Sequence, residues 1–420
     1  MMAALLLRVP GRHRVTSRNS TQLLHAPRAS GEPARGGMLK RISVKAPTSL
    51  TYGRMLERPK QLGGKVSASR SQQGQQHIAL LDIYRILAAL SVMFFHLTFN
   101  GLRNGKLNAA IDFAPLSHWT EYGNFGVQFF FLISGLVIFL TPSDSAGTFM
   151  RKRLVRLYPA FWAAVTLTSI FAFFLGGQKM SVSIPQYLAN LTMFPRTFGY
   201  GYVDGVYWTL KYEMQFYACV FLVYLFGAAQ WRDKILMLTA ALIAIGLLLK
   251  SGFKIRIPFD LYNYSFFLGG ALIAIVQRQG YSLIPSLLII ALCVLSSLSA
   301  RSATIVACLY AAMLLLTIPR IANLKILGSR LMGALTYPIY LVHAHIGYMV
   351  MSAIAGPNRP YTALCLTVAL ILCLALAIHF LIERRMRHFW VNWCEKLFEV
   401  PITRLQQRLT MRRPAMTSGH

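Results

Sequence analysis

The chain has 420 residues, of which 55% are hydrophobic and only 13% are charged, and its mean hydropathy is +0.49. Soluble domains contain about a quarter of charged residues, so this composition excludes an ordinary soluble protein. Several apolar runs reach the roughly 20 residues that a helix needs to cross a hydrocarbon core. They lack the alternation of a membrane β-strand. We therefore expect an all-α fold, a polytopic bundle of transmembrane helices.

More than half of the formal net charge of +30 lies at the two ends of the chain. Residues 1–77 hold 14 Lys and Arg against two acidic residues, and residues 383–420 hold eight against three. Basic segments beside membrane helices normally mark the cytoplasmic side and can contact anionic lipid. No zinc finger, RNA-binding signature or helix-turn-helix stands out. We therefore expect the lipid bilayer as a partner, and no nucleic acid.

Residues 1–77 are rich in Arg, Ser, Gly, Pro and Gln and have no sustained apolar period. This composition predicts a disordered basic N-terminal region. An Arg-rich, acid-poor start also fits an organelle transit peptide. It fits equally well an over-extended gene start, with Met38 or Met55 as the true one, and the sequence leaves these alternatives open.

Ten apolar segments follow, and we expect each to cross the membrane: about 78–99, 124–141, 157–175, 207–227, 234–250, 259–277, 282–299, 302–318, 331–352 and 361–382. Basic residues gather in alternate loops, as at 151–156 and 320–330, although Lys250, Lys254 and Arg256 lie on the opposite side. The positive-inside rule therefore predicts that both termini are cytoplasmic, and the even number of spans agrees.

The ten segments form one expected membrane domain, residues 78–388. The longest loop, about 176–206, should lie on the outer side. Residues 389–420 mix aromatic and charged side chains, which predicts a cytoplasmic, amphipathic basic tail on the inner interface. Such a chain would be a multi-pass protein of the inner, cytoplasmic membrane.

The first apolar segment, "IALLDIYRILAALSVMFFHLTF", carries Arg85 and His96 eleven residues apart. On a helix this spacing returns to within ~20° of the same face and spans ~16 Å. A charge at the membrane centre costs roughly 2.5–3.5 kcal/mol on insertion scales, so it usually faces a bundle interior or a wet cavity. A structural alternative pairs Arg85 with Asp82 and leaves His96 at the outer interface.

Two further polar features lie in the third and fourth segments. Arg153 and Arg156 share a helix face in "RKRLVRLYPAFW", and their guanidinium groups suit phosphate oxygens. Ordinary positive-inside residues are the alternative. Glu213 lies within "YWTLKYEMQFYACVF", where a carboxylate is rare and is a functional candidate. Neutralising Lys211 or an arginine elsewhere is its alternative role.

Other polar residues in the apolar segments favour packing. Ser134 precedes Gly135, which favours close helix packing over a nucleophile because no GxSxG motif is present. His343 and His345 would point to nearly opposite faces of one helix, and the six cysteines form no CxxC pair. We therefore expect no metal site.

In their order along the chain, these segments resemble the acyltransferase 3 family of membrane O-acyltransferases. Its first-helix pattern, Arg-x10-His, is matched by "LLDIYRILAALSVMFFH", and its GV-x-x-FF-x-x-SG segment by "FGVQFFFLISGLVI". Its basic RxxR stretch resembles "RKRLVRLYPAFW", its W-S/T-L-x-x-E-x-x-FY segment resembles "YWTLKYEMQFY", and "YPIYLVH" and "IERRMR" also fit. Thr209 stands where serine is common, and Arg385 where proline often follows. The resemblance covers about residues 78–388.

The resemblance implies acyl transfer from cytosolic acyl-CoA, usually acetyl-CoA, to a hydroxyl of a cell-surface or exported carbohydrate. Acyl-CoA is then a donor substrate, and no bound cofactor is expected. Arg153 and Arg156, with Arg85 deeper, would hold the CoA phosphates or pantetheine arm. His96 would be the general base or carry the acyl group, and Glu213 would orient it or stabilise its charge. Second-rank candidates for lining the site are Trp208, Tyr340 and Ser134.

A multi-pass transporter or flippase of a polar metabolite is the alternative function, because intramembrane Arg, His and Glu suit it too. That reading predicts symmetric, Gly- or Pro-broken helices. Pro338 and Gly269–Gly270 are expected to break two segments, but not at symmetric positions. A third reading is a non-catalytic membrane scaffold. The sequence leaves the acceptor, the acyl chain length and the oligomeric state open.

Overall fold

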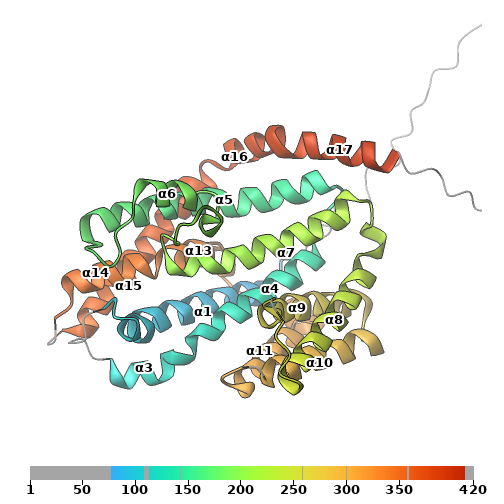
Figure 1. The fold of residues 1–420 in the computed structure, drawn as a ribbon, viewed down its shortest axis with the longest axis horizontal. Helices are drawn as coiled ribbons and strands as arrows, with labels where there is room; N and C mark the ends of the chain where they lie inside the picture. Colours follow the sequence, from blue (N-terminus) through green and yellow to red (C-terminus); the bar gives the residue numbers. More distant parts are fainter. Residues whose placement is uncertain are drawn as a thin grey trace, which may run out of the picture. The chain divides into compact units, whose positions relative to one another are not determined.

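The computed structural model describes residues 77–107, 113–141, 143–257, 259–298, 300–356 and 359–411. These residues form helices joined by loops, and no strand occurs among them (Figure 1). The all-α prediction is thus confirmed for the described part. Except for His77, the basic region expected to be disordered lies outside it.

Each of the ten apolar segments forms helix, and the ninth forms two: α1 (Ala79–Phe95), α4 (Gly126–Leu140), α5 (Ala146–Leu175), α7 (Trp208–Leu225), α8 (Arg232–Gly252), α9 (Leu261–Gln279), α10 (Leu283–Leu298), α11 (Ala303–Leu315), α13 (Ser329–Val342) with α14 (His345–Ile354), and α15 (Pro360–Ala377). Short helices join them: α2 (Gly101–Arg103), α3 (Ala114–Thr120), α6 (Ile184–Asn190) and α12 (Pro319–Ala322).

Among the described residues, five helical stretches are long and apolar enough to cross a membrane: Ala79–Arg103, Ala114–Leu140, Ala146–Leu175, Ala229–Gly252 and Pro360–Arg384. Several other apolar helices are shorter, including α10, α11 and α14. A helical membrane protein follows from these lengths, while the count of ten spans and the sides of the termini stay predictions.

Helix α5 begins eleven residues earlier than the expected 157, so the basic stretch 151–156 lies within the helix. Ser145 caps it, because its hydroxyl accepts a hydrogen bond from the Thr148 amide at 3.1 Å. Pro159 lies inside α5 without ending it. The two arginines of the RxxR motif therefore stand on one rigid helix face.

The ninth segment breaks at His343 and Ala344, five residues after Pro338. The His343 Nδ1–H donates to the Tyr340 carbonyl at 2.7 Å, which satisfies a carbonyl at the end of α13. The Asp204 carboxylate accepts from the His345 amide at 2.8 Å, where α14 begins. The expected break at Gly269–Gly270 is wrong, because α9 continues through both glycines.

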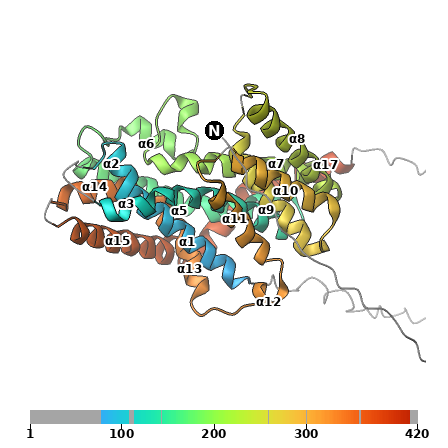
Figure 2. The same cartoon turned by 90° about the horizontal axis from the view of Figure 1, so that it is seen from below.

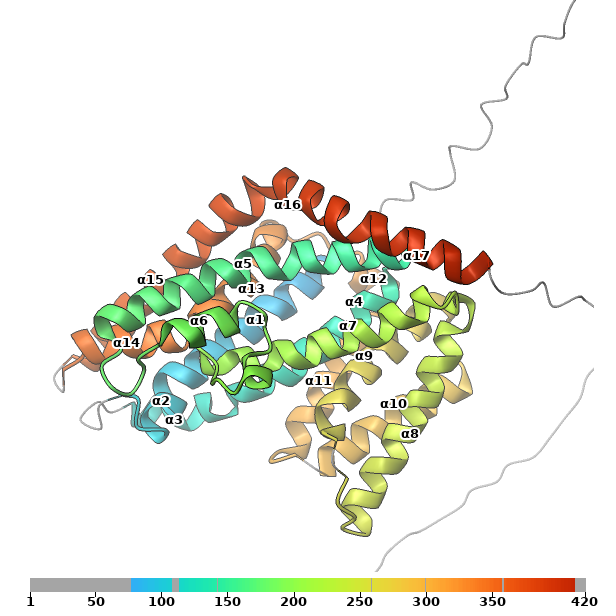
Figure 3. The ribbon, with the colours of Figure 1, turned by 45° about the horizontal axis from the view of Figure 1, so that its top comes forward.

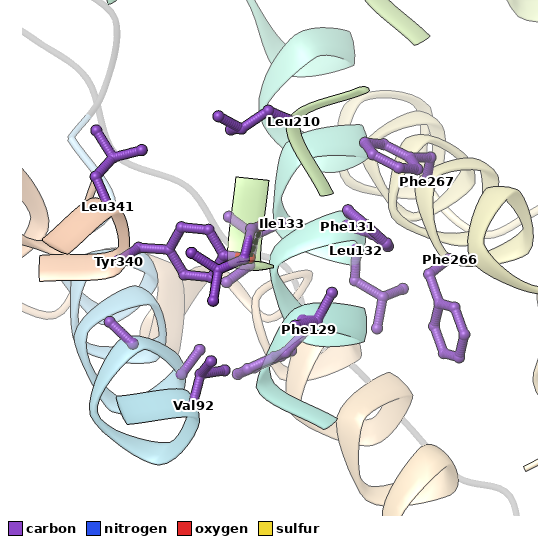
Figure 4. Close-up of a cluster of buried hydrophobic side chains, with 14 of the residues drawn as sticks. Val92, Phe129, Phe131, Leu132, Ile133, Leu210, Phe266, Phe267, Tyr340 and Leu341 are labelled. Atoms are coloured by element: carbon purple, nitrogen blue, oxygen red, sulfur yellow. Dashed lines mark hydrogen bonds between the residues drawn. The ribbon is translucent and has the colours of Figure 1, made fainter. Parts of the chain in front are cut away.

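Helices α4 and α9 cross closely because glycines meet backbone there. A Cβ at Gly135 would collide with the Phe267 carbonyl, and one at Gly270 with the Leu132 carbonyl. Figure 4 shows Phe131 and Phe267 beside this crossing, with ring centroids 4.5 Å apart. The packing role predicted for the Ser-Gly pair of α4 is confirmed.

Replacing Gly270 with alanine is expected to destabilise the helix bundle, because the new methyl group overlaps a backbone carbonyl that cannot rotate away. Overpacking of this kind costs about 1–3 kcal/mol. Gly252→Ala is the matched control, since a Cβ there meets no atom within 4 Å. Thermal unfolding of the detergent-solubilised protein measures the difference, and equal midpoints for the two variants would refute the crossing.

The helices gather into two groups. Helices α8 to α11 lie together beside α4, whereas α1, α13, α14 and α15 pack with α5 at the other end (Figure 2). Helix α7 runs between α4 and α5. The polar residues singled out in the sequence lie where α1, α4, α5, α7 and α13 meet.

The C-terminal segment packs along α5, as Figure 3 shows for α16 (Arg387–Cys394) and α17 (Val400–Met411). Glu399 accepts a hydrogen bond from the Thr148 hydroxyl at 2.6 Å and forms an ion pair with Arg151. Gln406 accepts from the Ala146 amide at 2.9 Å. The expected tail is therefore helical to Met411, and hydrogen bonds and an ion pair join it to the first turns of α5.

Candidate active site

His96 stands where α1 changes into one π-helical turn, η1 (His96–Asn100), which ends with the Gly101 amide bonded to the His96 carbonyl. Such turns are rare and often mark functional sites. His96 Nδ1 lies 2.6 Å from the Tyr348 hydroxyl and 3.2 Å from the Asn100 amide nitrogen. The Nδ1 edge of the imidazole is thus bonded to Tyr348 of α14 and to Asn100 of its own helical turn.

A second histidine lies against His96. The ring centroids of His96 and His343 are 5.1 Å apart. His343 is fully buried, and its Nδ1–H bonds the Tyr340 carbonyl, so its Nε2 carries the lone pair. That Nε2 has no hydrogen-bond partner within the described part of the chain. A buried acceptor without a partner is uncommon, and here it lies beside His96.

These neighbours were missed by sequence reasoning. Asn100 is one turn from His96, so its helical spacing could have suggested it. Tyr348 and His343 belong to the ninth segment, which was expected to break at Pro338 but continues through it and breaks at His343 and Ala344. The break after α13 gives these two residues their positions, and only the Asp204 contact across the fold explains it.

A narrow cavity lies toward the opposite end of α1. Its free volume is about 70 Å³. Arg85, Arg153, Arg156 and Glu213 all line it, from α1, α5 and α7, and so do Ser134 and Tyr340. The structure therefore brings together the predicted donor-binding residues, while His96 is not among those that line this cavity.

Arg153 is a buried cation held between rings. Its exposed fraction is 8%, and its guanidinium carbon lies 5.4 Å from the ring centres of both Phe149 and Tyr217. Its Nε is buried without a hydrogen-bond partner, and no carboxylate among the described residues pairs with it. Because a buried unpaired charge is costly, this guanidinium is suited to an incoming anion.

Arg85 takes part in both arrangements that the sequence allowed, an ion pair with Asp82 and a place in the wall of the cavity. It donates to Asp82 at 3.2 Å, the contact of the structural alternative, and it also lines the cavity. Asp82 is pressed against Gly333 of α13, where a Cβ would overlap the carboxylate. The pair therefore fixes the Arg85 head at the cavity wall.

Glu213 differs from its expected role. Its carboxylate accepts hydrogen bonds from the Ser134 hydroxyl at 3.2 Å and from the Tyr217 hydroxyl. Within the described residues no hydrogen bond joins Glu213 to His96. Helical periodicity placed Glu213 within an apolar helix but could not select its partner, and the structure places it among the arginines.

Tyr340 lies between the cavity and His96. It lines the cavity, and its ring centre lies 5.5 Å from that of His343, which in turn contacts His96. Its hydroxyl is 2.7 Å from the Thr209 hydroxyl and donates to the Val206 carbonyl. Figure 4 shows its ring reaching toward Ile133 of α4. Tyr340 and His343 thus connect the cavity to His96 through ring contacts.

Beyond His96 lies an open hollow of about 490 Å³, lined by Lys106, Arg196, Gly201, Tyr202, Gly205, Trp208, Lys211, Tyr212 and His345. The Lys106 ammonium donates to His345 Nε2. Burial lowers the pKa of Lys106, and the Asp204 carboxylate opposes that shift. Neither His96 nor His343 is among the residues that line this hollow. Its link to His96 is His345, whose ring centre lies 6.0 Å from that of Tyr348, the residue that bonds His96.

Tyr348→Phe is expected to lower the turnover number about tenfold with little change in the Michaelis constant for either substrate, because the hydrogen bond that orients His96 contributes about 0.5–1.5 kcal/mol. Tyr310→Phe is the control, since that hydroxyl is buried in α11 against Ser265. Steady-state kinetics of both variants check the role. An equal loss in the two would assign Tyr348 to stability alone.

Comparison with known proteins gives the family. The family model described as an acyltransferase domain, acyltransferase 3, matches residues 78–382. Nodulation protein 10 of Rhizobium leguminosarum bv. viciae is 31% identical over 169 residues, which cover 35% of this chain and 44% of that protein. The match thus spans less than half of this relative. No solved structure matches significantly. The family model covers most of the chain, and the protein belongs to the acyltransferase 3 family.

Proposed function

We propose that the protein is an integral membrane O-acyltransferase of the inner, cytoplasmic membrane, with ten spans and both termini in the cytoplasm. It moves an acyl group, acetyl first of all, from cytosolic acyl-CoA to a hydroxyl of a cell-surface or exported carbohydrate. The observation that carries the proposal is a row of neighbouring rings whose first member lines the cation-lined cavity and whose last lines the open hollow: Tyr340, His343, His96, Tyr348 and His345. Two substrates can meet at such a row from opposite ends.

The donor side is the narrow cavity. Phosphate oxygens suit guanidinium forks, and Arg153 is buried without a counter-ion. The cavity is well below the roughly 300–1,000 Å³ typical of ligand pockets, so it accommodates a narrow chain and not an adenine nucleotide. The pantetheine arm would therefore pass Arg153 and Arg85, while the nucleotide stays outside near the exposed Arg156.

The proposed chemistry takes place at His96. If Nδ1–H donates to Tyr348, and Asn100 turns its amide oxygen toward the Tyr348 hydroxyl, Nε2 keeps a free lone pair. Nε2 removes the proton from the acceptor hydroxyl as its oxygen bonds to the thioester carbon. The C–S bond then breaks, and the imidazolium returns the proton to the CoA thiolate.

A second route has His96 carry the acyl group, with the imidazole nitrogen attacking the thioester and the acceptor hydroxyl attacking the acyl-imidazole. Incubation with labelled acyl-CoA in the absence of acceptor distinguishes the routes. Label that stays on the purified chain after quenching, and that is absent from His96→Ala, selects the acyl carrier. Intact acyl-CoA under the same conditions selects the general base.

Glu213 is a positioning residue in this proposal. It holds the Tyr217 hydroxyl, and the Tyr217 ring packs against the Arg153 guanidinium. Loss of its charge would therefore act on donor binding. This assignment replaces the direct support of His96 that the sequence suggested.

The test is release of CoA thiol by the purified full-length chain in detergent, with acetyl-CoA and a mixed pool of bacterial cell-surface oligosaccharides. The proposal predicts CoA release that depends on the saccharide, together with an ester on the saccharide that mild base removes. Saccharide binding or vesicle uptake without any CoA release would overturn it in favour of the transporter alternative.

A further inference from the structure

The hollow beyond His96 collects three cations without a direct ion pair among the described residues, although the Asp204 carboxylate acts on Lys106. The charged side chains that line it are Lys106, Arg196 and Lys211. Among the described residues none of the three forms a salt bridge. Each instead faces a tyrosine ring: Lys106 over Tyr348 at 5.6 Å, Arg196 over Tyr202 at 5.6 Å and Lys211 over Tyr212 at 5.9 Å. Convergent unpaired cations in a concave site attract an anion.

The same hollow offers apolar ring faces. Trp208 is 37% exposed and lines the hollow together with Tyr202 and Tyr212. Such rings present flat faces with a polar edge, against which the C–H face of a pyranose can pack. Cations and aromatic faces together fit a sugar that carries a negative group.

Gly201 and Gly205 line the hollow, and the space beside each is open enough for a side chain. A Cβ at Gly201 would meet only Gln186, and one at Gly205 only His345, both at 3.7 Å, an ordinary contact. Side chains there would extend into the hollow. Packing within the described chain therefore does not require glycine at either position, and the absence of side chains there widens the hollow.

The wall of the hollow is held in place before any ligand binds. Asn190 donates to the Gly201 carbonyl at 3.0 Å and accepts from the Val203 amide at 2.9 Å. Asp204 ties the same loop to the start of α14. A pre-formed wall reduces the entropy cost of binding.

The hollow is connected to His96 through His345 and Tyr348. His345 lines it, and the His345 ring centre is 6.0 Å from that of Tyr348, whose hydroxyl bonds His96. Lys106 contacts both His345 and the Tyr348 ring. A sugar ring placed on Trp208 with its negative group on the cations would lie beside the row of rings that leads to His96.

We infer that the acceptor is an anionic saccharide, whose carboxylate or phosphate group is bound by Lys106, Arg196 and Lys211 while its ring packs on Trp208. The saccharide is called the acceptor because this inference rests on the proposed acyl transfer. The binding site itself is independent of that transfer and can be tested without acyl-CoA.

The experiment is calorimetric titration of the purified full-length chain in detergent, without acyl-CoA, by three disaccharides. These are cellobiose, the corresponding glucuronate–glucose disaccharide and cellobiose phosphate. We expect about tenfold tighter binding of at least one anionic sugar than of cellobiose, decreasing as salt screens the charges. The tighter of the two anionic sugars identifies the group as carboxylate or phosphate.

Two charge variants and a control sharpen the result. Arg196→Gln and Lys211→Gln alter exposed side chains, so the fold should persist, and each should weaken the anionic sugar about tenfold while leaving cellobiose unchanged. The control, Lys250→Gln, removes an exposed cation at the end of α8, outside the residues that line the hollow.

The inference is overturned if neither anionic sugar binds more tightly than cellobiose, or if the control weakens binding equally. Selective binding without CoA release in the earlier test would refute acyl transfer and leave this site intact.

Discussion

Replacing His96 with alanine is expected to lower acyl transfer by about a thousandfold, within the 10²–10⁴-fold typical of positioned general bases. The imidazole is the only titratable group that is hydrogen-bonded to Tyr348 among the described residues, and it belongs to the row of rings between the cavity and the hollow. The measurement is transfer of labelled acetyl from acetyl-CoA by the purified variant, at equal protein concentration.

Binding of CoA is the control for this variant. His96 does not line the arginine cavity, so the dissociation constant for CoA should stay within about twofold of wild type, since distant sites are nearly additive. Wild-type transfer by His96→Ala would exclude both catalytic routes. Loss of transfer accompanied by loss of CoA binding would instead indicate that the variant is misfolded.

Arg153→Gln is expected to have the second largest effect, on donor binding. A hydrogen bond to a charged group contributes about 1.5–3 kcal/mol, so the Michaelis constant for acyl-CoA should rise roughly 10- to 150-fold. Arg153→Lys should recover part of the loss, because lysine keeps the charge and lacks the planar fork.

The matched control is Arg320→Gln, which removes an exposed arginine from α12, outside the cavity. Kinetics at varied acetyl-CoA separate the effect on the Michaelis constant from that on turnover. The assignment fails if Arg153→Gln lowers turnover and leaves the Michaelis constant unchanged, or if Arg320→Gln raises it equally.

Periodicity predicted the helices and the polar residues that face a shared interior. Arg85, Arg153, Arg156 and Glu213 were selected one helix at a time, and the structure gathers them around one cavity. This works because a charge within an apolar helix must face an interior whatever its neighbours are. Gly135 was likewise identified from its type alone.

Neither the hydrogen-bond partners of these residues nor the ends of the helices could be predicted from periodicity. Glu213 faces Ser134 and Tyr217 because of how α4 and α7 are rotated, and no single-helix pattern contains that rotation. The start of α5 is polar, so hydropathy missed it, although Ser145 followed by Thr148 is a recognisable cap. The break at His343 and Ala344 is held by Asp204, which accepts from the His345 amide and lies about 140 residues earlier in the chain.

The central claim, that donor and acceptor reach His96 from opposite sides of a membrane, is tested by an assay in sealed proteoliposomes. Labelled acetyl-CoA is supplied outside, and an oligosaccharide acceptor is trapped inside. The account predicts labelled saccharide in the lumen and an equal amount of free CoA outside, both absent with His96→Ala. Transfer that occurs only when both substrates are on the same side, or movement of saccharide without loss of acetyl from CoA, would contradict it.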